Sequence, residues 1–215
     1  MIKRQLNKHV MITELISTIL QLFVFTLIPF LAYIISKRKA KGFFEYIGLK
    51  KSNRKANMWA VITSLIFFIP PLLLVIFNNS FFEIMNNSES MTGKFREMGF
   101  GAEALFLIII IAVFKTSLAE EILFRGFVAK RLISATSYQT GNILQALIFG
   151  AIHTALFLTI SSNVFFLAFI FVFPALGAYV SVYINEKLAD GSIIPGWISH
   201  GLANVLSYSI IGFLV

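Results

Sequence analysis

Residues 104–129 of the chain have the sequence ALFLIIIIAVFKTSLAEEILFRGFVA. The stretch is long enough to span a bilayer core, which takes about 20 mostly apolar residues in a helix. It nevertheless holds four ionisable side chains, which are Lys115, Glu120, Glu121 and Arg125. A charged group inside a membrane span is costly unless it is paired or faces water, so each of these is a candidate functional residue. The stretch therefore predicts a membrane helix that also carries polar chemistry.

Apolar segments of similar length lie on both sides of this stretch. They are residues 14–36, 59–77, 143–160, 164–184 and 193–215. The whole chain of 215 residues is 58% hydrophobic and only 13% charged, whereas about a quarter of an average soluble protein is charged. The sequence predicts an all-α, polytopic bundle of about six spanning helices embedded in the lipid bilayer. The high content of Phe excludes intrinsic disorder, and the absence of Cys excludes a disulfide scaffold and thiol chemistry.

The basic residues lie mainly in one loop. The net charge of +8 could indicate that the protein binds nucleic acid. However, eight of the Lys and Arg residues lie between two apolar segments, in residues 37–58. This is typical of a cytoplasmic loop, so we expect no nucleic-acid binding. If six spans alternate, eleven Lys and Arg face the cytoplasm and five face outward. Lys3, Arg4 and Lys8 then lie on the outer side, a misfit that a surface-lying or re-entrant first segment would remove.

The two adjacent glutamates are expected to have different roles. Glu121 and Arg125 are four residues apart, which places them on one helical face as an ion pair. Glu120 points about 100° away and has no basic residue three or four positions distant. It can therefore face a cavity and serve as a general base. We favour a purely structural role for the Glu121–Arg125 pair. Lys115 is expected only to snorkel or to pair with an acid.

Two later segments carry further polar residues. Phe149 and His153 share a helical face, as do His200 and Asn204, because each pair is four residues apart. At about 1.5 Å per residue, Glu120, His153 and Asn204 all lie near 15 Å from the cytoplasmic ends of their spans, and His200 lies near 10 Å. A lone histidine is also a common interhelical hydrogen-bond partner, and Phe149 fits simple packing. The shared depth favours one site in the cytoplasmic half of the membrane.

These residues resemble the three motifs of the CAAX-protease and bacteriocin-processing family, also called Abi or type II CAAX prenyl endopeptidase-like intramembrane proteases. The motifs are two glutamates followed after three residues by arginine, then Phe-x-x-x-His, then His-x-x-x-Asn. In this chain they fall, in that order, at Glu120, Glu121, Arg125, Phe149, His153, His200 and Asn204. The resemblance covers roughly residues 100–210. Better-known members are described with about eight spans, so seven or eight helices are the alternative to six.

The resemblance implies hydrolysis of a peptide bond within the membrane. Glu120 with His153 would activate a water, His200 and Asn204 would stabilise the oxyanion, and Arg125 would hold Glu121. The substrate would be a membrane protein or peptide, because members of the family cut prenylated CAAX proteins, process pheromones or bacteriocin leaders, or confer self-immunity. A composition rich in Lys, Asn, Ile and Phe favours a bacterial cell membrane and disfavours prenylated substrates.

Three alternatives stay open at this point. Zinc could bind to Glu and His side chains, but the chain has no His-Glu-x-x-His motif and Asn is a poor zinc ligand, so no cofactor is expected. A non-catalytic immunity or scaffold protein could use the same cavity, and a proton relay could use the same residues. In each case residues 1–100 are expected to form a variable membrane region with a basic loop at 37–58 and a polar loop at 78–103. Residues 101–215 are expected to form the catalytic core.

Overall fold

The computed structural model describes the backbone of residues 2–215 and the side chains from residue 7 onward. The side chains of Lys3 and Arg4, which the charge count placed outside, therefore lie beyond the described part. The described chain is mostly helical and contains no strand. Five helices are long and apolar enough to cross a membrane, and they lie at Asn7–Lys37, Arg54–Phe77, Ala102–Ala135, Tyr138–Phe157 and Val164–Leu188. These match five of the six predicted spans, and the chain is an all-α, membrane-embedded bundle.

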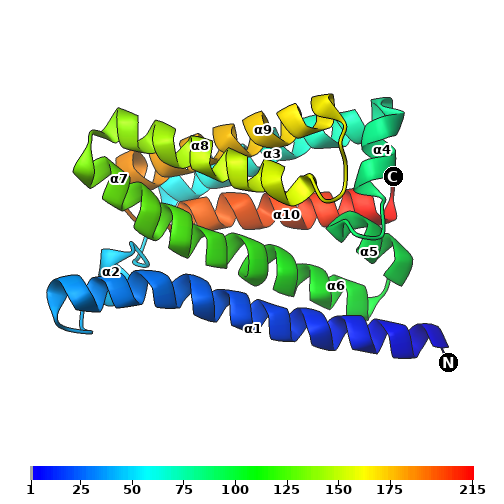
Figure 1. The fold of residues 1–215 in the computed structure, drawn as a ribbon, viewed down its shortest axis with the longest axis horizontal. Helices are drawn as coiled ribbons and strands as arrows, with labels where there is room; N and C mark the ends of the chain where they lie inside the picture. Colours follow the sequence, from blue (N-terminus) through cyan, green and yellow to red (C-terminus); the bar gives the residue numbers. More distant parts are fainter. Residues whose placement is uncertain (1) are drawn as a thin grey trace.

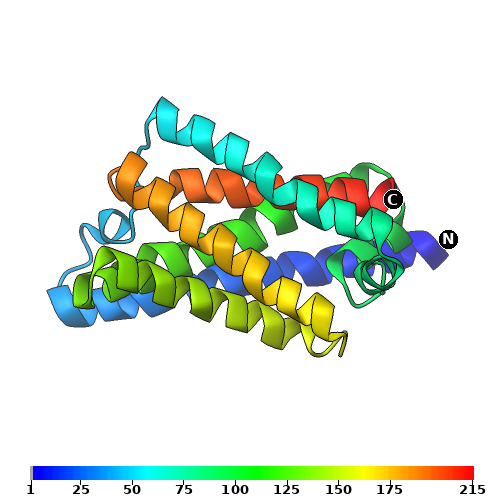
Figure 2. The same ribbon diagram turned by 90° about the horizontal axis from the view of Figure 1, so that it is seen from above.

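The sixth predicted span also folds as a helix, α10 (Ile194–Phe213). It is not among the five helices that are both long and apolar enough to cross a membrane. Polar residues such as Ser199, His200 and Asn204 lower its mean hydropathy. The helix lies inside the bundle, where it packs against α3 (Arg54–Phe77) and against the third membrane helix. Figure 2 shows α10 beneath α3 and α9 (Val164–Tyr183). Its polar side chains are therefore turned toward protein rather than toward lipid.

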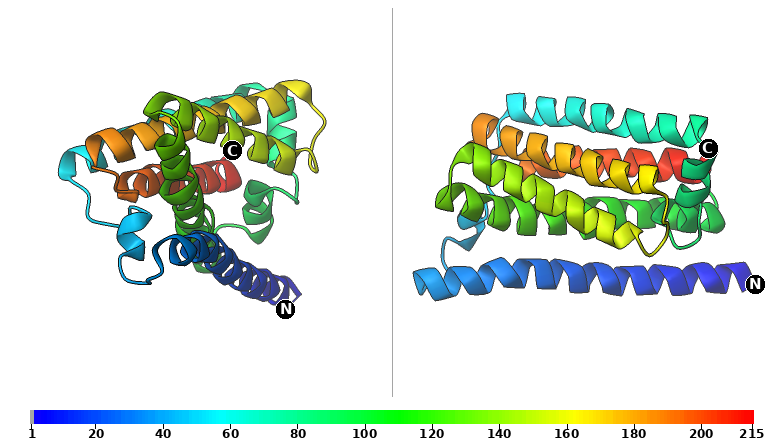
Figure 3. Two further views of the ribbon diagram at one scale, coloured as in Figure 1. Left: turned by 60° about the vertical axis from the view of Figure 1, so that its left-hand side comes forward. Right: turned by 45° about the horizontal axis from the view of Figure 1, so that its top comes forward.

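The long helices alternate in direction along one axis (Figure 1). Both termini lie at the same end of the bundle, beside the short helices α4 (Asn79–Met85) and α5 (Met91–Met98). The opposite end carries α2 (Phe43–Tyr46) and α7 (Lys130–Ala135). The first helix, α1 (Ile2–Lys37), runs the full length of the bundle at its edge (Figure 3). The first segment is thus one continuous helix alongside the others, long and apolar enough to cross a membrane.

The third membrane helix departs from the regular α-helix that the spacing argument assumed. It begins as α6 (Ala102–Ile109), continues through the π-helices η1 (Ile110–Leu118) and η2 (Glu121–Ala129), and ends in α7. Distant side chains donate to its carbonyl groups: Trp197 Nε1 to Val113 O at 2.7 Å and Gln21 Nε2 to Lys115 O at 2.9 Å. Stretches of π-helix are rare and are frequent at functional sites. Glu120 lies between the two π-helical stretches, and Glu121 is the first residue of the second.

Candidate functional site

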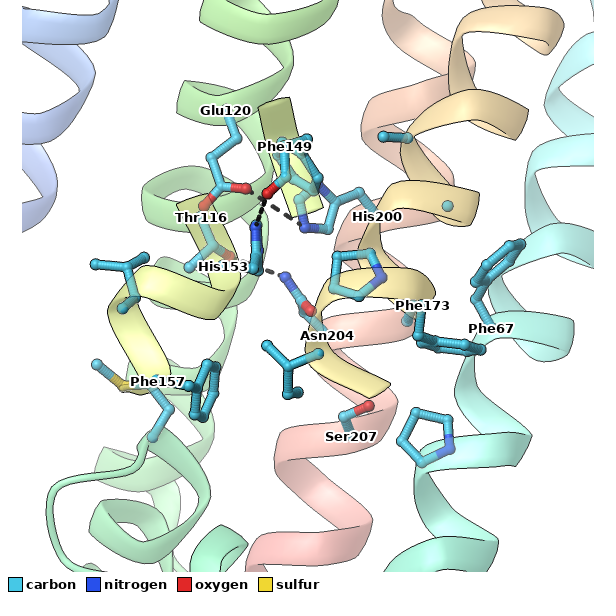
Figure 4. A pocket seen from close by; sticks show the side chains of 18 of the residues that line it. Phe67, Thr116, Glu120, Phe149, His153, Phe157, Phe173, His200, Asn204 and Ser207 are labelled. Atoms are coloured by element: carbon cyan, nitrogen blue, oxygen red, sulfur yellow. Dashed lines mark hydrogen bonds and ion pairs between the residues drawn. The ribbon is translucent and has the colours of Figure 1, made fainter. Parts of the chain in front are cut away.

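A cavity of about 630 Å³ lies inside the bundle. Its walls come from the π-helical segment, α3, α8 (Tyr138–Phe157), α9 and α10, with the short helices α4 and α5 at one end. Four polar residues named from the sequence line it together, which are Glu120, His153, His200 and Asn204 (Figure 4). Three helices bring them to one place, as predicted from the shared depth of Glu120, His153 and Asn204 and the nearby depth of His200. Aromatic rings form much of the remaining wall, among them Phe67 of α3 and Phe173 of α9, whose centroids are 5.1 Å apart.

Glu120 presents a carboxylate to this cavity. Its Oε2 atom lies 3.9 Å from Nε2 of His200, and no side chain in the described part of the chain donates a hydrogen bond to it. A buried carboxylate oxygen without a donor is uncommon in folded proteins. The oxygen is therefore free to accept a proton or a hydrogen bond from a molecule that enters the cavity.

Glu121 has a different environment, although it is the next residue. Its side chain is 0% exposed, and its Oε1 atom lies 3.2 Å from Nε of Arg125. Ser181 donates its hydroxyl hydrogen to Oε2 over 3.2 Å, and Nδ1 of His200 lies 3.5 Å from Oε1. The ion pair predicted from the four-residue spacing is present. Glu121 is held by its neighbours, whereas Glu120 is open to the cavity.

Arg125 and Phe149 connect the first motif to the second. The guanidinium carbon of Arg125 lies 4.0 Å from the centre of the Phe149 ring, a cation–π geometry that is most favourable where water is excluded. Both side chains are buried. Phe149 also meets Phe124 edge-on at 5.1 Å and the ring of His153 at 4.3 Å. The aromatic ring therefore fixes the imidazole relative to the ion pair.

The hydrogen bond of His153 determines which ring nitrogen is available. Nδ1 lies 2.9 Å from the backbone oxygen of Phe149. A carbonyl oxygen can only accept, so Nδ1 must donate, and Nε2 of the neutral ring then carries the lone pair. Figure 4 shows this imidazole between Glu120 and Asn204. His153 thus offers a proton acceptor beside the carboxylate of Glu120.

His200 and Asn204 occupy the facing helix. The two ring nitrogens of His200 approach one glutamate each, because Nε2 faces Glu120 and Nδ1 faces Glu121. Asn204 donates from Nδ2 to Thr116 Oγ1 at 2.9 Å and to Ser117 Oγ at 3.3 Å. An amide nitrogen carries two hydrogens, so both are already engaged. The expected role of Asn204 at an oxyanion remains a prediction that requires one of these bonds to be exchanged.

Several contributors to the site were missed by the sequence argument. Ser181 holds Glu121, and Thr116 accepts from Asn204; only the four-residue spacing of Thr116 and Glu120 could have drawn attention to the threonine. Lys115 pairs with an acid, as expected, but its partner was not predicted: it is Glu14, 2.6 Å away, at the first position of the first predicted span. Residues of the N-terminal region therefore reach the neighbourhood of the cavity.

Zinc is the alternative to a metal-free mechanism. Within the described part of the chain, no three side chains of His, Cys, Asp or Glu are grouped so that they could hold a metal ion. Catalytic zinc in proteins has three protein ligands and one open position. The metal-free mechanism stays a prediction.

Comparison with known proteins gives one match. Residues 102–206 match the family described as type II CAAX prenyl endopeptidase Rce1-like, and this range includes all the residues of the three motifs. No curated protein and no solved structure matches the chain. The chain therefore carries, at residues 102–206, a domain of the Rce1-like type II CAAX prenyl endopeptidases, the family of membrane proteases that its motifs resemble.

Proposed function

We propose that the protein is an intramembrane endopeptidase in which Glu120 and His153 activate a water molecule. The observation that carries this proposal is the free Oε2 of Glu120, which faces the same cavity as His153, whose Nδ1 is bound to Phe149 and whose Nε2 carries the lone pair in the neutral ring. The family domain supports a hydrolase of peptide bonds. The substrate is a membrane-associated protein or peptide, because the cavity lies inside a bundle of membrane helices.

The reaction needs one proton acceptor and one site for negative charge. The water gives a proton to Glu120 while its oxygen attacks the carbonyl carbon of the peptide bond, and His153 orients the water through Nε2. The tetrahedral intermediate carries a negative oxygen. The C–N bond then breaks, and the proton held by Glu120 passes to the amine that leaves. Water is consumed, Glu120 is again a carboxylate, and the products are one carboxylic acid and one amine.

His200 and Asn204 are the candidates to stabilise the oxyanion. Both lie across the cavity from His153 on α10 (Figure 4). Preorganised donors aimed at developing negative charge are worth about 3–4 kcal/mol each in enzymes. In this arrangement His200 donates from Nε2, the nitrogen that faces Glu120, and Asn204 exchanges its bond to Ser117, the longer of its two, for one to the oxyanion.

The cavity wall indicates the kind of peptide that fits. Phe67, Phe157 and Phe173 all line the cavity away from the charged residues (Figure 4). Apolar side chains beside the scissile bond would be taken from lipid into this wall at little cost, whereas charged ones would lose their solvation. We therefore propose apolar peptides as substrates, in peptide processing such as that of bacteriocins or pheromones, or in self-immunity.

Glu120→Gln and His153→Ala in the full-length protein test this function. Each variant and the wild type are expressed in membranes, and the membrane peptides are compared by mass spectrometry. Both substitutions are expected to abolish the cleavage products while insertion stays normal. Glu83→Gln, an exposed glutamate of α4, is the matched control and keeps the products. Full activity in either site variant would show that the assignment is wrong.

A further inference from the structure

The first membrane helix presents a polar strip to the catalytic helix. Glu14, Thr18 and Gln21 are three or four residues apart on α1, so they share one face. Glu14 and Thr18 are buried. Ile16 and Phe23, on other sides of the helix, are exposed toward lipid. The strip therefore faces the protein interior.

Both ends of this strip contact one residue, Lys115. Oε2 of Glu14 lies 2.6 Å from Nζ of Lys115, and the two side chains are 9% and 13% exposed. Gln21 donates to the backbone oxygen of Lys115. Lys94 of α5 lies farther away, at 3.7 Å from Oε1 of Glu14, and its side chain is 36% exposed. Glu14 is thus the close counter-ion of a lysine that is partly buried among membrane helices.

Lys115 lies on the cavity side of its helix, as Glu120 does. The two residues are five positions apart, and both line the cavity. Hydrogen bonds in a π-helix join residues i and i+5, and η1 extends through Leu118, so the spacing is about one turn. Without Glu14, the ammonium group of Lys115 would be unpaired in a cavity that also holds the undonated Oε2 of Glu120. An unpaired charge among membrane helices is costly, so we expect the ammonium group to turn to Glu120, the carboxylate of the same cavity that has no donor.

We infer that Glu14 is a positioning residue of the active site. By holding the charge of Lys115, it keeps the Glu120 carboxylate free for the water. The base role of Glu120 rests on the proposed function, whereas the arrangement of charges does not. Glu14 lies outside the matched residues 102–206. The inference therefore assigns the N-terminal membrane region a part in the chemistry of the Rce1-like domain.

The reactivity of Glu120 reports on this arrangement without any substrate. N,N′-dicyclohexylcarbodiimide modifies carboxyl groups that can be protonated in apolar surroundings, and an ion-paired carboxylate reacts more slowly. The full-length protein is treated in membranes, and modification of Glu120 is followed by mass spectrometry. The variants are Glu14→Leu, Lys115→Met and the combination of the two. Glu83→Leu on α4 is the control for loss of a glutamate at an exposed position.

Glu14→Leu is expected to slow modification of Glu120 about tenfold, as a new ion pair in a partly buried site would. The double variant is expected to return to within about twofold of the wild type, because no unpaired lysine remains to occupy Glu120. The amount of cleavage products is expected to rank the variants in the same order as the modification rate of Glu120. Lys115→Met alone is expected to slow the modification of Glu120 less than Glu14→Leu does. Glu83→Leu is expected to change neither the modification rate nor the amount of cleavage products.

Two results would overturn the inference. One is an unchanged modification rate in Glu14→Leu. The other is a double variant that is as slow as Glu14→Leu, which is what a purely structural contact between α1 and η1 predicts. If the modification rates follow the expected order but the wild type yields no cleavage products, the charge arrangement stands and the proposed function fails.

Discussion

The guanidinium group of Arg125 lies against the face of Phe149, with 4.0 Å between its central carbon and the ring centre. The same side chain places Nε 3.2 Å from Glu121. Arg125 therefore contacts an aromatic ring and a carboxylate at once, and both partners are buried. Because the ring also contacts His153, the position of the imidazole depends on an ion pair that takes no part in proton transfer.

Glu121→Gln is expected mainly to lower stability. Removal of one partner from a buried ion pair costs about 3–5 kcal/mol, because the other charge is left unpaired. Thermal unfolding in detergent and the yield of inserted protein measure the loss. Glu186→Gln is the control, since its pair with Lys130 is partly exposed and should cost less. A Glu121→Gln protein that is as stable as the wild type yet as inactive as Glu120→Gln would refute the division of roles between the two glutamates.

Gly196→Ala is expected to destabilise the site from the opposite helix. A Cβ atom at this position would overlap Oε2 of Glu121, Oγ of Ser181 and Nδ2 of Asn185. Overpacking of a buried position typically costs about 1–3 kcal/mol. Gly101→Ala is the control, because nothing lies within 4 Å of its added methyl group. The midpoint of thermal unfolding should fall only for Gly196→Ala, and equal midpoints would show that the ion pair can move aside without cost.

The parts of the site that depend on local spacing were predictable from sequence. A segment inside lipid must satisfy its own backbone hydrogen bonds, so long apolar runs form helices. Hydropathy therefore locates the spans. A four-residue spacing puts Glu121 beside Arg125 and Phe149 beside His153, and both contacts are present. These features need no knowledge of which helices are neighbours.

The remaining features depend on contacts between distant segments. The π-helical backbone around Val113 and Lys115 receives hydrogen bonds from Trp197 and Gln21, and neither donor is marked by any local pattern. The partner of Lys115 lies in α1, and the amide of Asn204 is bound by Thr116. A histidine between two carboxylates likewise follows from packing, because the depth estimate orders residues along the membrane normal but not around each helix.

Metal chelation is expected to leave the activity unchanged. In the described structure no three candidate ligands converge, and the proposed proton acceptor is a carboxylate that needs no metal to accept a proton from water. Treatment of the membranes with 1,10-phenanthroline, followed by quantification of the cleavage products, measures this. Loss of products that returns when zinc is added would establish a metal enzyme and contradict the mechanism above.

Asn204→Leu and Thr116→Val together test what the Asn204 amide does. If the amide donates to the oxyanion during the reaction, Asn204→Leu should lower kcat by about 10²–10³-fold. Thr116→Val should lower it far less, because the amide loses one acceptor but keeps both hydrogens. The comparison requires kcat and KM on one identified peptide substrate, with folding verified by thermal unfolding. Equal losses in the two variants would mean that Asn204 acts through Thr116, as a tie between α10 and the π-helix, and that His200 alone faces the oxyanion.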